Sequence, residues 1–449
     1  MSRSFVSLLL VLLALSYAAP AFAAGLYEDP ATGQIYSRPG EGRVALQAPA
    51  DSVSALYEDP DTGLVYARPG KGRAPLAMST PAQKPQAEAG SSGYAGKEFV
   101  DAVKGVMGDE EKNKYPKITV GALFYGEYFY DFHNEIINPD GSHGGRNKFA
   151  LNRGYINLRA ELTPEIKVRV TPDITRDALG DYKFRLKYGY VGFHDFLKPY
   201  PSFEVKLGQF EGAWLDYEEN LWTYRMQGTM LVEREGFMDS ANLGVSLQGK
   251  LPAGYGEWQG IVDNGEGYHA DETNKYKSFQ ARLTLVPAPR IEWLKGLNIT
   301  GFYTAGKEKV VNTYQLQRDR AIAFMGYKYR DDLFVGGEYL WTRGKDKFIA
   351  QPASKAQNLE GNGFSAMVWY RMPFLKPLRL MGRYDYFDHD HDSSNNSVNR
   401  YIYGISYDLG KYVTFLVNNE HTTADKGLKA GATKEQNENL LKVDVQWKY

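Results

Sequence analysis

The last nine residues of the chain alternate between apolar and polar side chains. Apolar side chains fall at Leu441, Val443, Val445, Trp447 and Tyr449, and a charged or amide side chain stands between each two of them. Because successive side chains of a β-strand point to opposite faces, this stretch predicts a strand with one apolar and one polar face. Such a strand suits a wall between lipid and water, and as the last strand of a closed barrel it leaves no unpaired edge. The edge strand of a soluble sandwich is the alternative.

The same two-residue period runs through the chain from Ile118 to its end. We predict sixteen strands, at residues 118–131, 149–162, 165–174, 182–195, 202–211, 239–250, 256–264, 276–287, 296–306, 319–330, 333–343, 363–372, 377–388, 399–408, 411–421 and 440–449. An even number is typical of bacterial outer-membrane barrels and returns both ends of the barrel to the periplasmic side. Trp447 and Tyr449 then fall at the periplasmic membrane interface, where aromatic side chains gather.

The connections between these strands alternate between short and long. Short turns are expected at 163–164, 198–201, 252, 287–289, 331–332, 373 and 409–410. Long connections are expected at 132–148, 175–181, 212–238, 265–275, 307–318, 344–362, 389–398 and 422–438. Membrane barrels have short periplasmic turns and long outer loops, whereas a soluble sandwich has no reason to sort its connections in this way. The predicted fold class is therefore all-β, a 16-stranded antiparallel transmembrane β-barrel over residues 117–449.

The third long connection, residues 212–238, is too apolar for a free surface loop. Trp214, Leu215, Leu221 and Trp222 need an environment away from water. We predict that this loop folds into the barrel and narrows it, with a subunit contact as the alternative. Its charged side chains would then line the constriction: Asp216, Glu218, Glu219, Arg225, Glu233 and Arg234.

The alternation also assigns each strand an outer face and a lumen face. In the strand at 182–195, Tyr182, Phe184, Leu186 and Tyr188 are expected to face lipid. Over four consecutive strands the lumen face collects eight basic side chains, which we predict to line the pore: Arg153, Arg159, Lys167, Arg169, Lys183, Arg185, Lys187 and Lys206. The acids that oppose them on this wall are few: Glu161, Asp173 and Glu204. Such a wall concentrates anions in a narrow lumen, although these residues could instead be ordinary solvated lumen residues, salt-bridged around the ring.

The N-terminal 116 residues divide into three segments. Residues 1–23 are expected to be a secretory signal, with Arg3, an apolar stretch at 5–15 and a cleavage site after Ala23. Residues 24–76 hold two near-identical copies of one motif, at 26–43 and 56–73, each expected to form a hairpin turned at Asp-Pro-x-Thr-Gly. They form either a tethered arm or a docking motif for a periplasmic partner or the cell wall. Residues 77–116 are expected to be a linker with a short helix at 99–107.

Composition removes several other functions. The 449 residues include no cysteine, which excludes disulfides, Cys-ligated zinc, iron–sulfur clusters and c-type haem attachment. A net charge of -1 argues against nucleic acid as a partner. The segment 388–392, Asp-His-Asp-His-Asp, suggests a metal site, but such a run is more often a solvated loop. No histidine falls in the middle of a predicted strand, so the wall offers no Ser–His pair for an enzyme. We expect no cofactor and no catalytic residue.

The segment 206–210, Lys-Leu-Gly-Gln-Phe, is followed by the long third loop and then by Ser-Ala-Asn-Leu-Gly-Val-Ser at 240–246. Together with the strand pattern, these residues resemble the phosphate-selective porin O and P family of Gram-negative bacteria over 117–449. The residues after Phe210 depart from the family pattern, which continues with a basic residue and a proline-containing segment. The resemblance implies a trimeric outer-membrane porin, embedded in lipid and lipopolysaccharide, that passes small hydrophilic solutes, but it does not name a substrate. The basic wall predicts a preference for anions, and phosphate-type anions are among the candidates.

Two other functions are compatible with the sequence. The barrel could be the membrane scaffold of a larger complex that docks a periplasmic partner, such as an electron carrier, through the repeats at 26–73. The chain could also be a soluble exported β-protein that binds carbohydrate. Conductance in a bilayer favours the porin, capture of a partner through the repeats favours the scaffold, and solubility without detergent favours the third.

Overall fold

The computed structural model describes most of the C-terminal part of the chain and short pieces of the N-terminal part. The described residues are 27–28, 35–36, 44–45, 57–58, 65–66, 74–75, 115–137, 143–177, 180–195, 202–272, 274–308, 316–349, 357–425, 427–428 and 437–449. The chain separates into two compact units, residues 1–94 and 95–449. Among the described residues, no helix combines the length and the apolar character needed to cross a membrane. The predicted signal, linker and short helix lie outside the described residues.

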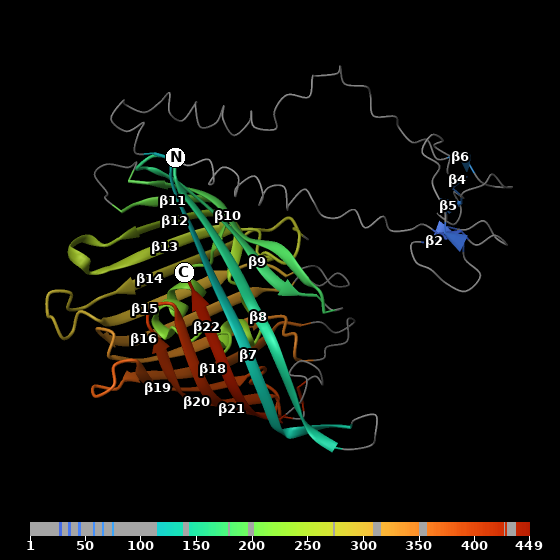
Figure 1. Cartoon of the computed structure of the whole chain (residues 1–449). Coiled ribbons are helices and arrows are strands. Elements are labelled where there is room, and N and C mark those ends of the chain that lie inside the picture. Colours follow the sequence, from blue (N-terminus) through green and yellow to red (C-terminus); the bar gives the residue numbers. More distant parts are fainter. Residues whose placement is uncertain are drawn as a thin grey trace. The chain divides into compact units, whose positions relative to one another are not determined.

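Sixteen antiparallel strands close into one barrel (Figure 1). Its strands are β7 (Lys117–Ile137), β8 (His143–Glu161), β9 (Ile166–Arg176), β10 (Tyr182–His194), β11 (Glu204–Glu211), β12 (Ala241–Lys250), β13 (Gly256–Asp263), β14 (Ser278–Leu285), β15 (Leu297–Ala305), β16 (Arg318–Tyr329), β17 (Leu333–Gly344), β18 (Leu359–Arg371), β19 (Leu378–Asp388), β20 (Ser397–Leu409), β21 (Val413–Ala424) and β22 (Asn437–Lys448). Each strand pairs with its neighbours in sequence, and β22 closes the ring on β7 with Val443 opposite Tyr128. The sixteen predicted strands and the closing role of the last one are confirmed.

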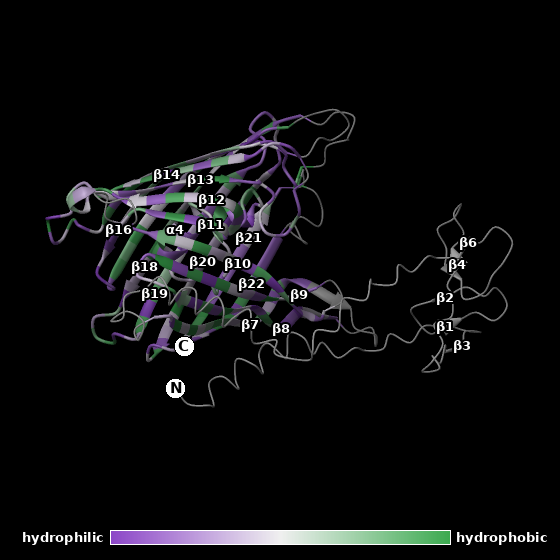
Figure 2. Cartoon of the chain, turned by 90° about the horizontal axis from the view of Figure 1, so that it is seen from above, coloured by the Kyte–Doolittle hydropathy of each residue, from purple (hydrophilic) through white to green (hydrophobic). Residues whose placement is uncertain are grey.

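The outer face of the barrel is apolar and the inner face is polar or packed. Along β14, exposed Phe279, Leu283 and Leu285 alternate with buried Ser278 and Arg282. Figure 2 shows this alternation of polar and apolar residues along the strands. A continuous apolar outer face would be unstable in water, because a soluble protein exposes only limited apolar patches. The soluble sandwich is therefore wrong, and the outer face is the one that contacts lipid.

Aromatic side chains gather at the barrel end that carries the short turns. Phe124 stacks on Trp447 with ring centres 5.4 Å apart. Tyr449, Trp293 and Phe374 are exposed at the same end. Aromatic rings with one apolar and one polar edge are stable at the membrane interface, which agrees with the predicted place of Trp447 and Tyr449.

The first hairpin is longer than predicted. Residues 132–148 were expected to form a loop, but β7 continues to Ile137 and β8 starts at His143. The pairing shifts register between Tyr130 and Glu135, which an alternation rule cannot follow. Asp131 holds the hairpin together, because it accepts hydrogen bonds from Asn134 and from Arg146 (3.0 Å). The prediction of a long loop at this place is wrong.

The two N-terminal repeats form two small sheets with the same topology. In the first, β1 (Tyr27–Glu28) pairs with β2 (Ile35–Tyr36) and with β3 (Val44–Ala45). In the second, β4 (Tyr57–Glu58) pairs in the same way with β5 (Val65–Tyr66) and β6 (Ala74–Pro75). The predicted hairpin is confirmed in each copy, and the third strand is an addition that the sequence pattern did not reveal.

Candidate pore constriction

The third loop lies inside the barrel. It contains α4 (Leu215–Trp222) and α5 (Leu231–Arg234), and the side chains of Trp214, Trp222 and Leu231 are fully buried. Trp214 packs against Phe302 of β15 and Phe324 of β16, with ring centres 5.9 and 5.7 Å apart. The infolded loop is confirmed. A subunit-contact loop is excluded because its apolar side chains are used inside the barrel.

Hydrogen bonds attach the loop to several strands around the lumen. The Tyr217 hydroxyl lies 2.8 Å from Thr300 Oγ1 on β15, and the Tyr224 hydroxyl lies 2.8 Å from Ser406 Oγ on β20. Further donors reach main-chain oxygens of the loop from β18, β19 and β22: Trp369 to Leu221 (3.2 Å), Arg383 to Thr229 (3.0 Å) and Lys442 to Gln227 (2.7 Å). Anchors on five strands make the loop a fixed platform across the lumen.

The charged residues of the loop divide into a lumen set and a buried residue. Arg225 bridges Glu219 (2.7 Å) and Glu233 (3.2 Å), and Arg234 pairs with Glu420 of β21. Asp216 is exposed to the lumen. The prediction that Glu218 lines the constriction is wrong, because its side chain is fully buried on the inner side of α4. Burial, with the neighbouring carboxyl group of Glu338, raises the pKa of Glu218 well above its ordinary value.

The predicted basic wall runs along β8 to β11, and two of its carboxylates are each shared by two cations. The Asp173 carboxylate forms ion pairs with the guanidinium groups of Arg153 at 3.2 Å and of Arg185 at 2.7 Å. Glu211 likewise pairs with Lys206 at 3.1 Å and with Arg169. One carboxylate cannot neutralise two cations, so this wall keeps a positive charge even where its members are salt-bridged.

Lys187 is the most unusual member of this wall. It is buried, and its ammonium lies 4.5 Å from the centre of the Tyr155 ring and 5.2 Å from that of Tyr188. Among the described residues no carboxylate lies within 4 Å of it. Aromatic faces therefore stabilise this cation without cancelling its charge.

The strand register explains why both Lys187 and Tyr188 face the lumen. The pairing of β10 with β9 skips Lys187, since Leu186 pairs with Pro172 and Tyr188 with Thr171. A bulged residue shifts the alternation by one, so Tyr188 turns inward, where the Arg169 guanidinium lies 4.3 Å from its ring centre. The prediction that Tyr188 faces lipid is wrong for this reason.

The remaining three basic residues lie further from the loop. Lys183 pairs with Asp177 at 2.6 Å near the outer end of β10, and its side chain is 64% exposed. Arg159 and Lys167 lie on β8 and β9 towards the short-turn end, and neither has an ion pair within 4 Å among the described residues. The structure thus brings five of the eight cations together beside the loop: Arg153, Arg169, Arg185, Lys187 and Lys206.

An outer loop adds two residues to the wall that the sequence analysis did not select. Tyr268 donates its hydroxyl hydrogen towards Asp173, and His269 Nδ1 lies 3.0 Å from an Arg185 nitrogen. Burial, and then repulsion by Arg185 and Arg153, lowers the pKa of His269 to about 4, so the ring is neutral at pH 7. The sequence of this loop has no periodic pattern from which the contact could have been predicted.

A cavity of about 340 Å³ opens at the outer part of the wall. Its charged lining consists of Lys148, Arg153, Arg176 and Arg185, and no described residue of the lining is acidic. Low-dielectric walls with charge of one sign concentrate counter-ions. This part of the lumen is therefore positively charged.

In the Asp-His-Asp-His-Asp segment at 388–392, His389 forms ion pairs with two carboxylates, an arrangement called here the His389 clamp. His389 is buried, with Nδ1 2.7 Å from Asp346 and Nε2 3.4 Å from Glu235. Burial opposes its charged form, but these two carboxylates outweigh that effect and raise the pKa of His389 to about 9. His391 points elsewhere and lies 2.8 Å from the main-chain oxygen of Glu360. Within the described part of the chain, no group of three or more metal-ligating side chains is placed to hold an ion.

Comparison with known proteins gives structural matches only, since no family model and no curated protein matches the sequence. The anion-selective porin from Comamonas acidovorans matches with a TM-score of 0.53 at 13% identity, over 75% of this chain and 100% of that one. The outer membrane channel DcaP of Acinetobacter baumannii matches with a TM-score of 0.53 at 12% identity, over 75% and 98%. OmpF of Salmonella typhi, in complex with daunomycin, matches with a TM-score of 0.53 at 10% identity, over 75% and 99%.

The barrel has the porin fold. At these identities the likeness concerns the fold alone. Together with its apolar outer face, the porin fold makes the chain a multi-pass β-barrel of the Gram-negative outer membrane.

In this porin-fold barrel the acidic edge of the loop and the basic wall interact across the lumen. Asp216 is close enough to Lys206 and Arg169 for their charges to influence it, and Glu219 acts in the same way on Lys187. Loss of hydration inside the barrel, with repulsion from Glu211 and Glu219, raises the pKa of Asp216 to about 6. A solute that passes between loop and wall therefore meets a field that depends on the protonation of Asp216.

Proposed function

We propose that the protein is an outer-membrane porin that lets small hydrophilic solutes diffuse passively and prefers anions, including anions of the phosphate type. The observation that carries this proposal is the incomplete neutralisation of the wall. Asp173 and Glu211 each serve two cations, and Lys187 is held by Tyr155 and Tyr188. The solved structure from Comamonas acidovorans, which shares the fold, is named an anion-selective porin.

The mechanism is electrostatic attraction combined with a size limit. Cations on β8 to β11 raise the concentration of anions beside the third loop, which occupies part of the lumen. The loop is anchored to five strands, so the limit on solute size is fixed. In keeping with the porin fold and the resemblance to trimeric porins, we propose that the protein works as a homotrimer in lipid and lipopolysaccharide.

Tracer uptake into proteoliposomes tests the proposal. Labelled inorganic phosphate and labelled rubidium are added outside vesicles that contain the full chain, and protein-free vesicles serve as the control. The proposal predicts faster uptake of phosphate than of rubidium. Faster uptake of rubidium would contradict the anion preference, and uptake of neither would contradict the channel.

A second role is suggested by the N-terminal repeats. Tyr27 pairs with Tyr36 in the first copy, and Tyr57 pairs with Tyr66 in the second. The chain therefore carries two small sheets with the same tyrosine pair. We infer that they dock a periplasmic partner at two points, which would make the barrel also a scaffold. Cross-linking in intact cells tests this with Tyr27→Ala, Tyr57→Ala and the double variant. Two-point docking predicts a strong loss of cross-links in each single variant, because avidity needs both contacts. Unchanged cross-linking in the double variant would contradict it.

A further inference from the structure

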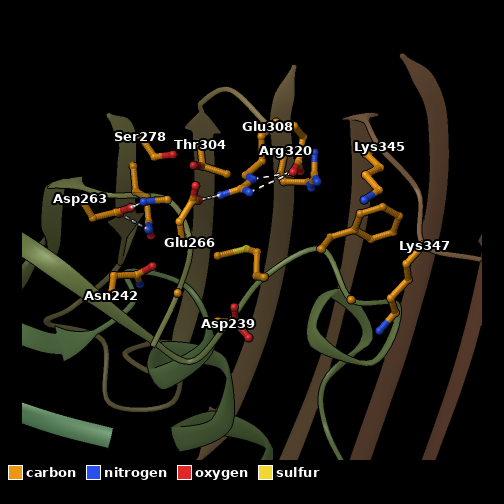
Figure 3. Close-up of a pocket in the computed structure, with 17 residues that line it drawn as sticks. Asp239, Asn242, Asp263, Glu266, Ser278, Thr304, Glu308, Arg320, Lys345 and Lys347 are labelled. Atoms are coloured by element: carbon orange, nitrogen blue, oxygen red, sulfur yellow. Dashed lines mark hydrogen bonds and ion pairs between the residues drawn. The ribbon is translucent and has the colours of Figure 1, made fainter. Parts of the chain in front are cut away.

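A polar cavity of about 230 Å³ lies between the end of the third loop and the outer ends of β13 to β16 (Figure 3). Its floor comes from residues 236–239, and its walls come from side chains of the five strands β12 to β16 and from the outer loops. None of the six charged residues predicted for the constriction lines it. The cavity is therefore a separate site in the outer vestibule.

One group of charged side chains in the cavity is held in internal contacts. The Arg318 guanidinium pairs with Glu308 at 2.9 Å and with Glu266 at 3.1 Å. Asp263 is buried and accepts hydrogen bonds from the Gly265 main chain (2.6 Å) and the Gln280 side chain (2.7 Å). These groups form a rigid wall in which the carboxyl groups outnumber the one guanidinium, so this wall, like Asp239, favours a positively charged group of a ligand.

Arg320 is a buried cation in the cavity lining without a carboxylate partner. Its side chain is 2% exposed, and one terminal nitrogen donates to the main-chain oxygens of Asp319 (2.8 Å) and Arg343 (2.9 Å). The guanidinium lies 4.8 Å from the Phe237 ring centre, and Nε has no hydrogen-bond partner. Among the described residues no carboxylate is within 4 Å of it. A buried guanidinium left in this state is stabilised by an anionic ligand group.

Asp239 supplies a carboxylate from the end of the third loop. Its side chain is 41% exposed, and the one basic side chain within 4 Å of it among the described residues is His269 at 3.9 Å, whose ring is neutral at pH 7. Gly267, with φ 71°, brings the main chain of an outer loop close to it, since a Cβ there would lie 2.1 Å from Asp239 Oδ2. Asn242, which is buried beside it in the lining, has a side-chain nitrogen without a partner. This side of the cavity therefore holds two polar groups, the Asp239 carboxylate and the Asn242 amide nitrogen, that are placed to bind a ligand.

The two sets of groups lie on different sides of the cavity. Figure 3 shows Asp239 at the lower side, Arg320 at the upper side, and Lys345 and Lys347 together at one edge. A simple anion would be attracted by Arg320 and the lysines but repelled by Asp239. A simple cation would be attracted by Asp239 but repelled by Arg320 and the lysines. A small solute that carries both charges satisfies both sides.

We propose that this vestibule cavity binds small zwitterions, namely amino acids and short peptides, before they reach the constriction. The ammonium group would pair with Asp239, and the carboxylate would accept hydrogen bonds from Arg320 and pair with Lys345 or Lys347. The unpartnered Asn242 nitrogen would donate to a carbonyl oxygen of the solute. The proposal concerns binding and does not depend on which ions the pore prefers.

Calorimetric titration of the full chain in detergent tests the proposal without requiring conductance. The probe is glycylglycine at pH 7, and acetate and ethylammonium serve as probes with one charge each. Glycylglycine should bind, and each single-charge probe should bind at least about tenfold more weakly because one charge-assisted contact is lost. Asp239→Asn and Arg320→Gln should each weaken glycylglycine by about tenfold or more.

Matched controls separate a loss of binding from a loss of folding. Asp271→Asn in an outer loop and Arg290→Gln at the short-turn end remove the same charges away from the cavity and should leave binding unchanged. If Arg320→Gln does not fold, as judged by circular dichroism, the exposed double variant Lys345→Gln/Lys347→Gln takes its place. No binding of glycylglycine, or equal binding of acetate with no effect of Asp239→Asn, would overturn the proposal.

Discussion

Lys187 holds its ammonium 4.5 Å from the centre of the Tyr155 ring, inside the barrel and beside the third loop. The contact depends on a β-bulge, because Lys187 is the residue of β10 that the pairing with β9 skips. An aromatic partner leaves the charge of the lysine available to anions, whereas a carboxylate would cancel it.

Removing this charge should weaken the anion preference more than removing one at the barrel end. We expect Lys187→Met to lower the chloride-to-potassium permeability ratio by about twofold or more, since the charge lies in a confined lumen. Lys183→Met is the matched control, because Lys183 is 64% exposed and paired with Asp177. Reversal potentials in planar bilayers measure both variants. An equal effect of the two would contradict the role of the bulge.

Ion preference should depend on pH through Asp216. Loss of hydration, with repulsion from Glu211 and Glu219, raises its pKa to about 6, so it is an anion at pH 7.5 and neutral at pH 5. Acidification therefore removes a negative charge that faces Lys206 and Arg169, and the chloride preference should rise as the pH falls through about 6. In Asp216→Asn this pH dependence should be smaller. A variant with the same pH profile as the natural protein would argue against this assignment.

The ion pairs of His389 should make the free energy of unfolding depend on pH between 6.5 and about 9. Its pKa is raised from 6.5 to about 9 by Asp346 and Glu235 despite its burial. A raised folded-state pKa gives stability that is fully present below 6.5 and is lost as the pH rises towards about 9. We expect the difference in the free energy of unfolding between the natural protein and His389→Gln to shrink over this range in urea titrations. His391→Gln, at an exposed ring, is the control.

Trp214 should be the strongest single apolar anchor of the third loop. It is fully buried and contacts Phe302, Phe324 and Tyr217. Trp214→Ala should lower the free energy of unfolding by about 3–5 kcal/mol through the cavity it leaves. Loosening of the loop should also make single-channel currents larger or noisier. Trp293→Ala, at an exposed turn outside the lumen, should leave the single-channel currents unchanged. Loss of stability with unchanged currents would show that the loop does not set the pore size.

The sequence was sufficient for the architecture because the signals of a barrel are local. A two-residue period, turn residues and the alternation of loop lengths each act within a few residues, and they located all sixteen strands. The same alternation failed at Tyr188 and in residues 132–148, where a bulge and a register shift interrupt it. Neither feature changes the amino-acid pattern enough to be seen in advance.

The site was predicted only in part, because its contacts join residues far apart in the chain. The wall cations could be assigned from strand faces, but the sharing of Asp173 by Arg153 and Arg185 depends on register across three strands. Glu218 was misplaced since a short helix inside the loop turns it towards Glu338. His389 meets Asp346 only after two outer loops have folded together, so its segment resembled a metal site.

The most direct test of the account is the reversal potential of the natural protein in a planar bilayer under a potassium chloride gradient. The incompletely neutralised wall predicts stepwise conductance with a reversal potential that favours chloride. A reversal potential that favours potassium would contradict the role of the wall and would make Asp216, Glu219 and Glu233 of the loop the selective groups.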